Sequence, residues 1–391
     1  MQFCDKIIVG DTMKKQKIKS IKLKDPYLGI AKVIGGILCI LLGLLIFYLK
    51  QVSDLTKLDY SREASKNILF TFHKDDVLKI GKSKTLNAAF ESIYFKEKYL
   101  TNYSKIDYVN HKNLIKNINK LLKIGYSNNE INIILSHGND SSVTNFTKRE
   151  KVRYLEEFYT IDYAKLDNYD RYVKYEEETA EDEELVVLYV NLDMDKEDYK
   201  DATLVTKFSE DMVVNKHRYL DKKFVPDNLV NISTKYASDS DLKCSKVALD
   251  AFIEMSKDCE AAGLGIVINS AYRSYQDQVD IEDLYRKYYG QAYVDKFVAK
   301  PGYSEHQTGL AFDIGSRTTN VFANSKEYKW MLDNAYKYGF TLRFTKSYED
   351  ITGFRSEPWH YRYVGKKIAK VLYDEDMTLE EYFVKYLDKQ M

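Results

Sequence analysis

The spacing of apolar residues changes along this 391-residue chain, and the first distinct pattern is that of a membrane-spanning helix. From Tyr27 to Leu49 the chain is apolar on every side, and only Lys32 interrupts it. At about 1.5 Å per residue such a helix is roughly 25 to 35 Å long, enough to cross a bilayer core. A buried helix of a soluble core is the alternative, but the lack of an amphipathic face favours a membrane span.

The charges around this segment predict its orientation. A cluster of six lysines lies just before it, and few basic residues follow it closely; the six are Lys14, Lys15, Lys17, Lys19, Lys22 and Lys24. Basic residues stay on the cytoplasmic side, and no small-residue cleavage site follows the apolar run. We therefore expect a cytoplasmic basic tail (1–26), an uncleaved single-pass anchor in the cell membrane (27–49) and an extracellular remainder.

Residues 50–205 have the spacing of amphipathic helices. One apolar stripe ends at Gly125, and Ser127 and Glu130 then have the spacing of a capping box; the stripe is Leu114, Ile115, Ile118, Leu121 and Leu122. A helix–turn–helix of this kind occurs in DNA-binding proteins, but the expected extracellular position argues against that function.

Two further stretches complete this region. The acidic run from Glu176 to Glu184 predicts a solvated loop and not a cation site, and the VVLYVN sequence at 186–191 predicts a strand. No chemistry can be assigned to 50–205. We expect a mostly helical spacer, wall-binding module or partner surface.

Apolar residues with helical spacing predict a helix from Leu242 to Ala262, with Cys244 and Cys259 on its buried face. Fifteen residues of helix correspond to about 22 Å, which is too far for a disulfide. We expect both cysteines to pack in the core.

Composition excludes some classes of protein. The chain is 45% hydrophobic and 30% charged, as in folded proteins, and its length suits about two folded units plus an anchor. With 59 basic and 59 acidic residues the formal net charge is zero, which gives no electrostatic reason to expect nucleic acid as a partner.

Candidate chemistry is confined to the C-terminal half. His306 and Asp313 are seven residues apart, so in an unbroken strand they would face opposite sides. A turn at 308–309, where a glycine occurs, would let the imidazole and the carboxylate converge.

A second motif follows at 357–365, with the sequence EPWHYRYVG. Its alternation predicts a strand with His360 on the face opposite Trp359, Tyr361 and Tyr363.

His306, Asp313 and His360 together have the donor set of a catalytic zinc site, with a fourth position left open for water. Such a site also needs a carboxylate that moves protons, and Glu357 is the candidate. Glu305 is the alternative, but neighbouring residues on an extended chain point apart. The other four histidines lie in no such pattern; they are His73, His111, His137 and His217.

At these residues the sequence resembles a known family. SEHQTGLAFD fits the pattern S-x-H-x-x-G-x-A-x-D, and EPWHYRY fits E-x-x-H with aromatic neighbours. Both are similar to the VanY-type D-alanyl-D-alanine carboxypeptidases, of the wider LAS fold group that includes lysostaphin and the sonic hedgehog N-terminal domain. The resemblance covers about 180 residues, from roughly Val214 to the end of the chain.

This resemblance implies an α+β zinc peptidase domain (206–391) with a central antiparallel sheet and flanking helices. It supports the three metal ligands and implies Glu357 as catalytic base. Arg273, just beyond a strand expected at 265–272, would stabilise the substrate's carbonyl or carboxylate, with help from Gln278 and Ser304. A structural salt bridge at Arg273 and backbone capping at the other two are the alternatives.

The expected function is removal of the C-terminal D-alanine from peptidoglycan stem peptides, with D,D cleavage favoured over L,D. Two alternatives remain open: a peptidoglycan endopeptidase, and a non-catalytic wall-binding module that keeps zinc for structure. The retained Glu357 argues against the module.

Overall fold

The computed structural model describes residues 25–387, and contacts divide the chain into two compact units, 1–119 and 120–391. The lysine-rich segment that predicts the orientation of the anchor lies outside the described residues, and the domain boundary at 205/206 stays a prediction.

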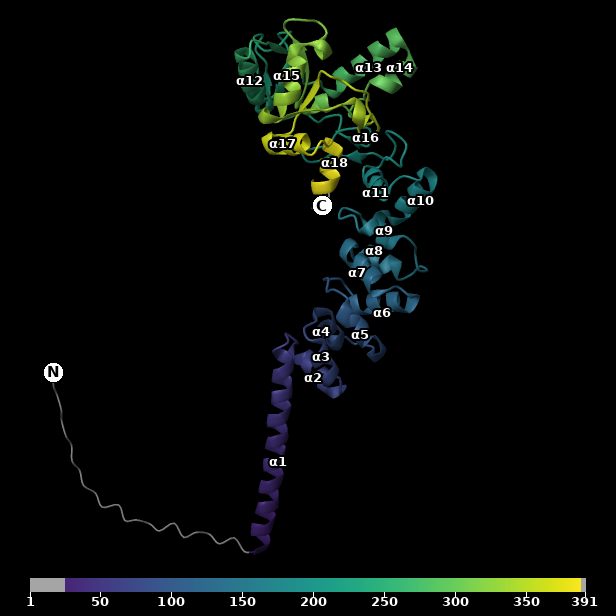
Figure 1. Ribbon diagram of the computed structural model, residues 1–391, viewed down its shortest axis with the longest axis vertical. Helices are drawn as coiled ribbons and strands as arrows, with labels where there is room; N and C mark the ends of the chain where they lie inside the picture. The colour runs from purple at the N-terminus through teal and green to yellow at the C-terminus, as the bar shows by residue number, and fades with distance from the viewer. Residues whose placement is uncertain (1–24, 388–391) are drawn as a thin grey trace, which may run out of the picture. The chain divides into compact units, whose positions relative to one another are not determined.

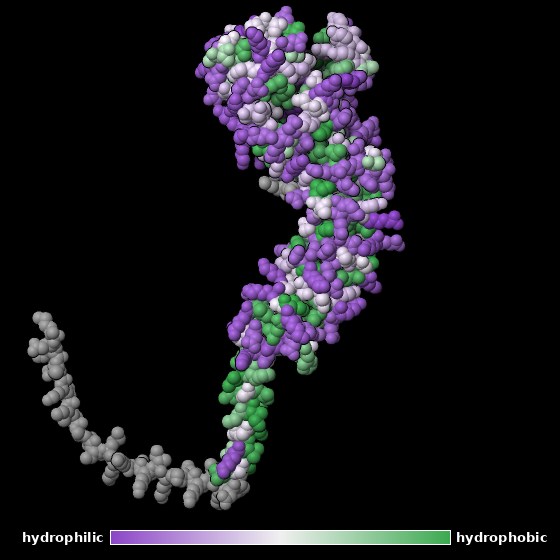
Figure 2. Space-filling view, in the orientation of Figure 1, coloured by the Kyte–Doolittle hydropathy of each residue, from purple (hydrophilic) through white to green (hydrophobic). Residues whose placement is uncertain are grey.

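Helix α1 (Asp25–Thr56) contains the expected membrane segment and extends beyond it. Figure 1 shows it as one long helix, and apolar side chains cover it, almost all of them exposed (Figure 2). Within the described part of the chain it is the one helix long and apolar enough to span a membrane. Leu55, near its end, is fully buried, so the last turn of α1 packs within the first unit.

Short helices make up the rest of the first unit and the start of the second. In the first unit they are α2 (Arg62–Phe70), α3 (Lys74–Ile80), α4 (Lys84–Glu91), the 3-10 turn η1 (Glu97–Tyr99), α5 (Leu100–Lys105) and α6 (Leu114–Ile124), within which the boundary falls. In the second they are α7 (Asn128–His137), α8 (Asp140–Phe146), α9 (Leu155–Tyr159), η2 (Leu166–Asn168), α10 (Tyr169–Thr179) and α11 (Glu183–Asn191). The capping box expected at the start of α7 is confirmed.

A buried polar network closes the first set of helices. The Asn119 amide donates to the carbonyl oxygen of Tyr94 (2.6 Å) and accepts a hydrogen bond from the Tyr103 hydroxyl (2.5 Å). That hydroxyl in turn accepts from the backbone N–H of Lys96 (3.2 Å). The buried Asn119 amide and Tyr103 hydroxyl are therefore both satisfied within this network, as burial requires.

The same network recurs in the second set, about 70 residues further along the chain. The Asn191 amide donates to the carbonyl oxygen of Tyr163 (2.9 Å) and accepts from the Tyr172 hydroxyl (2.6 Å), which accepts from the N–H of Lys165 (2.9 Å). Both networks connect a 3-10 turn, the helix that follows it and a later helix.

The starts of the two sets also correspond. Ser61 caps α2 and Ser127 caps α7, and each serine follows a buried tyrosine, Tyr60 or Tyr126. We conclude that most of the region between α1 and the peptidase motifs is a tandem repeat of one helical module.

The expectation of a strand at 186–191 is wrong, because these residues lie in α11. Asp182 caps this helix by accepting the N–H of Glu184, and Val186, Val187 and Val190 are buried in it. Tertiary burial outweighs the strand preference of β-branched residues here. The acidic run is also not one loop, since most of it lies in the last turns of α10 and the first turn of α11; those side chains are nevertheless largely exposed, as expected for a solvated stretch.

The remainder of the second unit mixes strands and helices. Its strands are β1 (Thr203–Leu204), β2 (Arg218–Tyr219), β3 (Leu229–Asn231), β4 (Lys243–Ser245), β5 (Ile266–Ser270), β6 (Ala311–Ser316), β7 (Phe340–Leu342) and β8 (His360–Tyr363). Its main helices are α12 (Lys246–Ala261), α13 (Tyr275–Tyr289), α14 (Gln291–Phe297), α15 (Lys326–Asn334), α16 (Glu349–Thr352), α17 (Lys366–Asp374) and α18 (Leu379–Tyr382). Shorter turns are η3 (Glu305–Thr308), η4 (Phe322–Asn324), η5 (Ala335–Tyr338), η6 (Lys346–Tyr348) and the π-helical Phe383–Leu387.

Four of these strands form an antiparallel sheet in the order β5-β6-β8-β7, as the expected α+β fold requires. One face packs its apolar side chains with α12 and α15, and the α13–α14 pair lies on the other side of the sheet (Figure 1). Because side chains alternate along a strand, every second residue of β6 and β8 points away from this apolar face and can be polar.

Cys244 lies on β4, paired with Val230 of β3, and only Cys259 lies on a helix, α12. The single helix expected across both is therefore wrong, because strand pairing takes up residues 243–245. Both thiols are buried and free, so the expected absence of a disulfide between them is confirmed.

If the repeated networks stabilise both modules alike, Tyr103→Phe and Tyr172→Phe will have similar effects. Each removes one hydroxyl and leaves a buried asparagine oxygen and a backbone N–H without a partner, a cost of about 1–3 kcal/mol. We expect a lower thermal unfolding midpoint for both variants of the detergent-solubilised chain, measured by circular dichroism. Tyr288→Phe, at an exposed tyrosine, is the control, and an unchanged midpoint in either variant would contradict the equivalence.

Candidate metal centre and cleft

Asp313 and His360 lie side by side because β6 and β8 are paired. In the antiparallel register Asp313 is directly opposite His360, while Phe312 is opposite Tyr361 on the other face. Directly opposite side chains of such a pair are about 4.5–5.5 Å apart at Cβ. The strand predicted at 357–365 is confirmed for 360–363.

His306 reaches the same place from the turn before β6. Residues 305–308 form the 3-10 turn η3, and Ser304 caps it by accepting the N–H of His306. Gly309 ends the turn with φ +69°, and a Cβ there would lie 3.0–3.1 Å from Leu229 and Ser245. The turn expected at 308–309 is therefore confirmed. It needs a glycine because the backbone has a positive φ and because a Cβ would lie too close to its neighbours.

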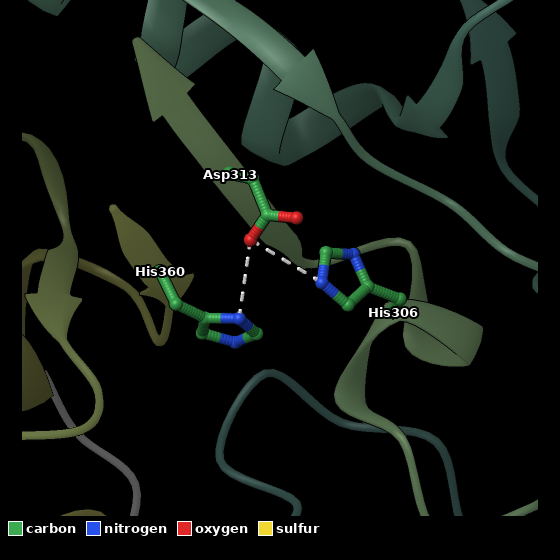
Figure 3. Close-up of side chains that lie close together, drawn as sticks. All are labelled: His306, Asp313 and His360. Atoms are coloured by element: carbon green, nitrogen blue, oxygen red, sulfur yellow. Dashed lines mark ion pairs between the residues drawn. The ribbon is translucent and has the colours of Figure 1, made fainter. Parts of the chain in front are cut away.

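The three side chains converge on one point (Figure 3). Asp313 Oδ1 is 3.5 Å from His306 Nε2 and 3.4 Å from His360 Nδ1. One possible ligand atom from each residue lies within 4.8 Å of the others.

The other ring nitrogen of each histidine has its own partner. His306 Nδ1 is 2.7 Å from the carbonyl oxygen of Ala271, so it carries the proton, and Nε2 is left as an acceptor. His360 Nε2 is 3.4 Å from Glu305 Oε2, which leaves Nδ1 facing Asp313. Such outer partners fix the tautomer and orientation of metal-binding imidazoles.

A bulge in β5 helps to place these groups. The pairing with β6 shifts between Ile268 and Ser270, and the chain then continues into Ala271 and Arg273. Bulges often redirect side chains beside functional sites. Here the chain after the bulge supplies the carbonyl oxygen that holds His306, and the backbone N–H of Arg273 donates to the His306 carbonyl.

The donors fit a divalent metal ion. Asp313 Oδ1 is buried and accepts no hydrogen bond of ordinary geometry, which is costly for a carboxylate unless a cation is bound. Two imidazole nitrogens and one carboxylate oxygen form the three-protein-ligand set of catalytic zinc sites.

The charges also favour a cation at this point. Burial and the charge of Arg273 lower the pKa of His306 to about 4, so its imidazole is neutral at pH 7. Burial by itself would lower the pKa of His360, but Asp313 and Glu305 raise it to about 9. A bound divalent ion would satisfy these carboxylates in place of the imidazole proton.

Glu357 lies at the edge of this cluster. Its Oε2 is 3.5 Å from His360 Nδ1, and the His360 N–H donates to its carbonyl oxygen, so a tight turn precedes β8. In an ideal strand Glu357 and His360, three residues apart, would face opposite sides. They do not do so here, because β8 begins only at residue 360. Burial raises the pKa of Glu357, as suits a group that accepts and returns a proton.

Arg273 presents a buried guanidinium to the same cleft. Its Nε has no hydrogen-bond partner, and burial lowers its pKa while Asp313 and Glu357 oppose that effect. No salt bridge of Arg273 is formed among the described residues. Because its Nε has no partner, the Arg273 guanidinium can bind an anion in the cleft.

Gln278 and Ser304 also line the cleft, which has a volume of about 470 Å³. Gln278 donates from Nε2 to the carbonyl of Ala299, so its buried, unpartnered atom is the acceptor Oε1. Ser304 caps the turn η3 through its oxygen, and its hydroxyl proton is left for another acceptor.

Three features were not foreseen from the sequence. Glu305 does not point away from the site, because residues 305–308 are a helical turn, and it contacts the candidate ligand His360. Trp359 is not aligned with the buried Tyr361 and Tyr363, since it precedes the strand, is 43% exposed and lines the cleft. Phe344 packs against the His360 ring at 4.8 Å between centroids.

The sequence of this chain is similar to those of known peptidases. The family model described as VanY, D-alanyl-D-alanine carboxypeptidase, matches residues 241–366. A putative carboxypeptidase, YodJ, of Bacillus subtilis (strain 168) is 42% identical over 181 residues, which cover 44% of this chain and 66% of that protein. The bifunctional D-Ala-D-Ala dipeptidase and carboxypeptidase VanXYC of Enterococcus gallinarum is 34% identical over 183 residues, covering 44% of this chain and 91% of that protein.

The solved LdcB LD-carboxypeptidase matches 48% of this chain and 91% of its own, with 39% identity and a TM-score of 0.44. The chain spans just under two thirds of the length of the Bacillus relative. This chain belongs to the VanY family of D-alanyl-D-alanine carboxypeptidases.

If the cluster binds a metal ion, Asp313→Ala will lose the ion without unfolding. Asp313 Oδ1 accepts no hydrogen bond of ordinary geometry, and both histidines keep their contacts with Ala271 and Glu305, so we expect the fold to persist. We expect about one equivalent of bound metal in the wild-type chain and far less in the variant, measured by inductively coupled plasma mass spectrometry. Asp333→Ala, at an exposed aspartate, is the matched control; equal metal content in all three proteins would rule out this site.

Proposed function

We propose that this chain is a zinc-dependent carboxypeptidase that removes the C-terminal D-alanine from peptidoglycan stem peptides. The observation that carries the proposal is the meeting of three elements in one cleft. These are the ligand triad of His306, Asp313 and His360, the carboxylate of Glu357, and the unpaired guanidinium of Arg273.

A zinc ion held by His306, Asp313 and His360 would lower the pKa of its bound water toward about 7 and polarise the scissile carbonyl. Glu357 accepts a proton from the attacking water and returns it to the leaving amine. Its raised pKa suits both transfers, because its carboxyl group binds a proton more readily than an exposed one does.

Arg273 binds the terminal carboxylate of the substrate. Its planar fork of N–H donors matches a carboxylate, and desolvation strengthens the attraction between them. Ser304 adds its hydroxyl proton to the same anion. Gln278 suits a substrate N–H better than a carboxylate, because its unpartnered atom is an acceptor.

The family supports D,D cleavage, which we favour, while the solved LdcB relative is an LD-carboxypeptidase, so L,D cleavage is the second candidate. Helix α1 supports attachment to the membrane, and the lysines before it support an extracellular site. Substrate stem peptides lie on that outer face.

Mass spectrometry of muropeptides incubated with the zinc-loaded chain tests the activity. We expect loss of a single alanine from pentapeptides, abolished by a chelator. Loss only from tetrapeptides would establish L,D cleavage, and a cut within the stem would establish an endopeptidase. An intact substrate with a folded, zinc-loaded protein would favour a binding module.

Glu357→Gln tests the role of the base. The amide cannot accept the proton, so we expect kcat to fall by roughly 10²–10⁴-fold while zinc content and the unfolding midpoint stay near wild type. Glu349→Gln, in the same cleft, is the matched control and should retain activity. Near-normal kcat in Glu357→Gln would assign the base elsewhere.

Arg273→Met tests recognition of the carboxylate. Loss of a buried anion partner should reduce kcat/KM by at least about 10²-fold for a peptide with a free C-terminus. A C-terminally amidated peptide should be a poor substrate for both proteins, with little difference between them. An equal loss on both peptides would instead indicate that Arg273 acts on the scissile carbonyl.

A further inference from the structure

Glu305 connects the metal centre to a buried network of charges. Its Oε2 faces His360 Nε2 at 3.4 Å, and its Oε1 accepts from Arg343 (2.9 Å) and Arg362 (3.0 Å). All four side chains are almost completely buried. The position of this carboxylate is therefore set by the two arginines.

Arg343 extends the network to the end of the chain. Its Nε donates to Glu305, while Nη1 and Nη2 form a bidentate pair with Glu380 at 2.8 and 2.5 Å. Glu380 lies in the short helix α18 and is fully buried. One rigid guanidinium thus bridges the turn that carries His306 and the C-terminal helix.

Glu380 is itself held in place. Thr378 and Glu381 form a capping box at the start of α18, and Leu379 is buried beside them. Asn215 donates to the Glu380 carboxylate at 3.1 Å. The anchor of the network is therefore a well-packed element about 20 residues beyond the last metal ligand and outside residues 241–366 that match the family.

Stability alone does not account for such an arrangement. Buried ion pairs cost desolvation, and apolar residues of similar size often serve stability equally well. What apolar residues cannot do is hold a carboxylate against the outer nitrogen of a ligand imidazole. That contact keeps Nδ1 of His360 directed at the metal position.

We propose that Glu380 and Arg343 are positioning residues, through which helix α18 fixes Glu305 and hence the orientation of the metal ligand His360. The inference deepens the proposed function and rests on its metal site. It adds a requirement for the C-terminal helix that the ligand motifs themselves do not contain.

The paired variant Arg343→Met with Glu380→Gln tests this in the full chain. It removes one positive and one negative charge together, and Glu305 keeps its bond to Arg362. We expect a cooperatively folded protein whose metal affinity, measured by chelator competition, is about 10–100-fold weaker. The absorption spectrum of the Co²⁺-substituted protein should change, and kcat should fall with KM little altered.

A second variant covers the case in which the pair does not fold. Glu380→Asp keeps the charge but moves the carboxylate by one methylene, and it should shift the same three readouts in the same direction by a smaller amount. The matched control is Lys366→Met with Glu254→Gln, which removes an exposed ion pair of the same domain and should leave all readouts unchanged.

Wild-type metal affinity, Co²⁺ spectrum and kcat in a folded Arg343/Glu380 variant would overturn the proposal, and so would a purely thermal effect of Glu380→Asp. Metal affinity and the Co²⁺ spectrum need no substrate. They therefore decide the positioning role even if the wild-type chain cleaves no muropeptide, an outcome that would count against the proposed function alone.

Discussion

The pairing of Asp313 with His360 across β6 and β8 is the constraint on which the metal centre depends. The same register places Phe312 opposite Tyr361 on the other face, where both rings are fully buried. A slip of one residue would turn these rings toward the cleft and the ligands toward the core. Burial of these two aromatic rings thus determines the face on which the two candidate metal ligands lie, so the same alternation of side chains serves both the core and the site.

Around that pair, buried charges compensate one another. Asp313 and Glu357 face a point where a cation is needed, while Arg273 lines the same cleft with an unpaired Nε. Glu305 is stabilised by arginines on the side away from the metal position. The site is therefore organised in two layers: ligands that need a metal ion, and an outer set that is already neutralised.

Much of this could be predicted from sequence because the informative signals were local. The turn at Gly309, the strand at His360 and the antiparallel sheet follow from spacing and from the family resemblance. Glu305 was misjudged because its direction depends on a helical turn that adjacency in sequence does not reveal. The ion pair between Glu305 and Arg343 depends on tertiary burial, and so does the helical conformation of residues 186–191. Periodicity in the sequence does not predict tertiary burial. The tandem repeat was in principle detectable as self-similarity, but its shared residues are sparse.

The repeat also has a consequence for how such a chain can change. Each module has its own buried polar network of one asparagine and two tyrosines, so neither copy depends on the other for that network. Gain or loss of a whole module would leave the ligands, their register and the outer charges untouched. The length of the helical region between α1 and the peptidase motifs can therefore change in steps of one whole module.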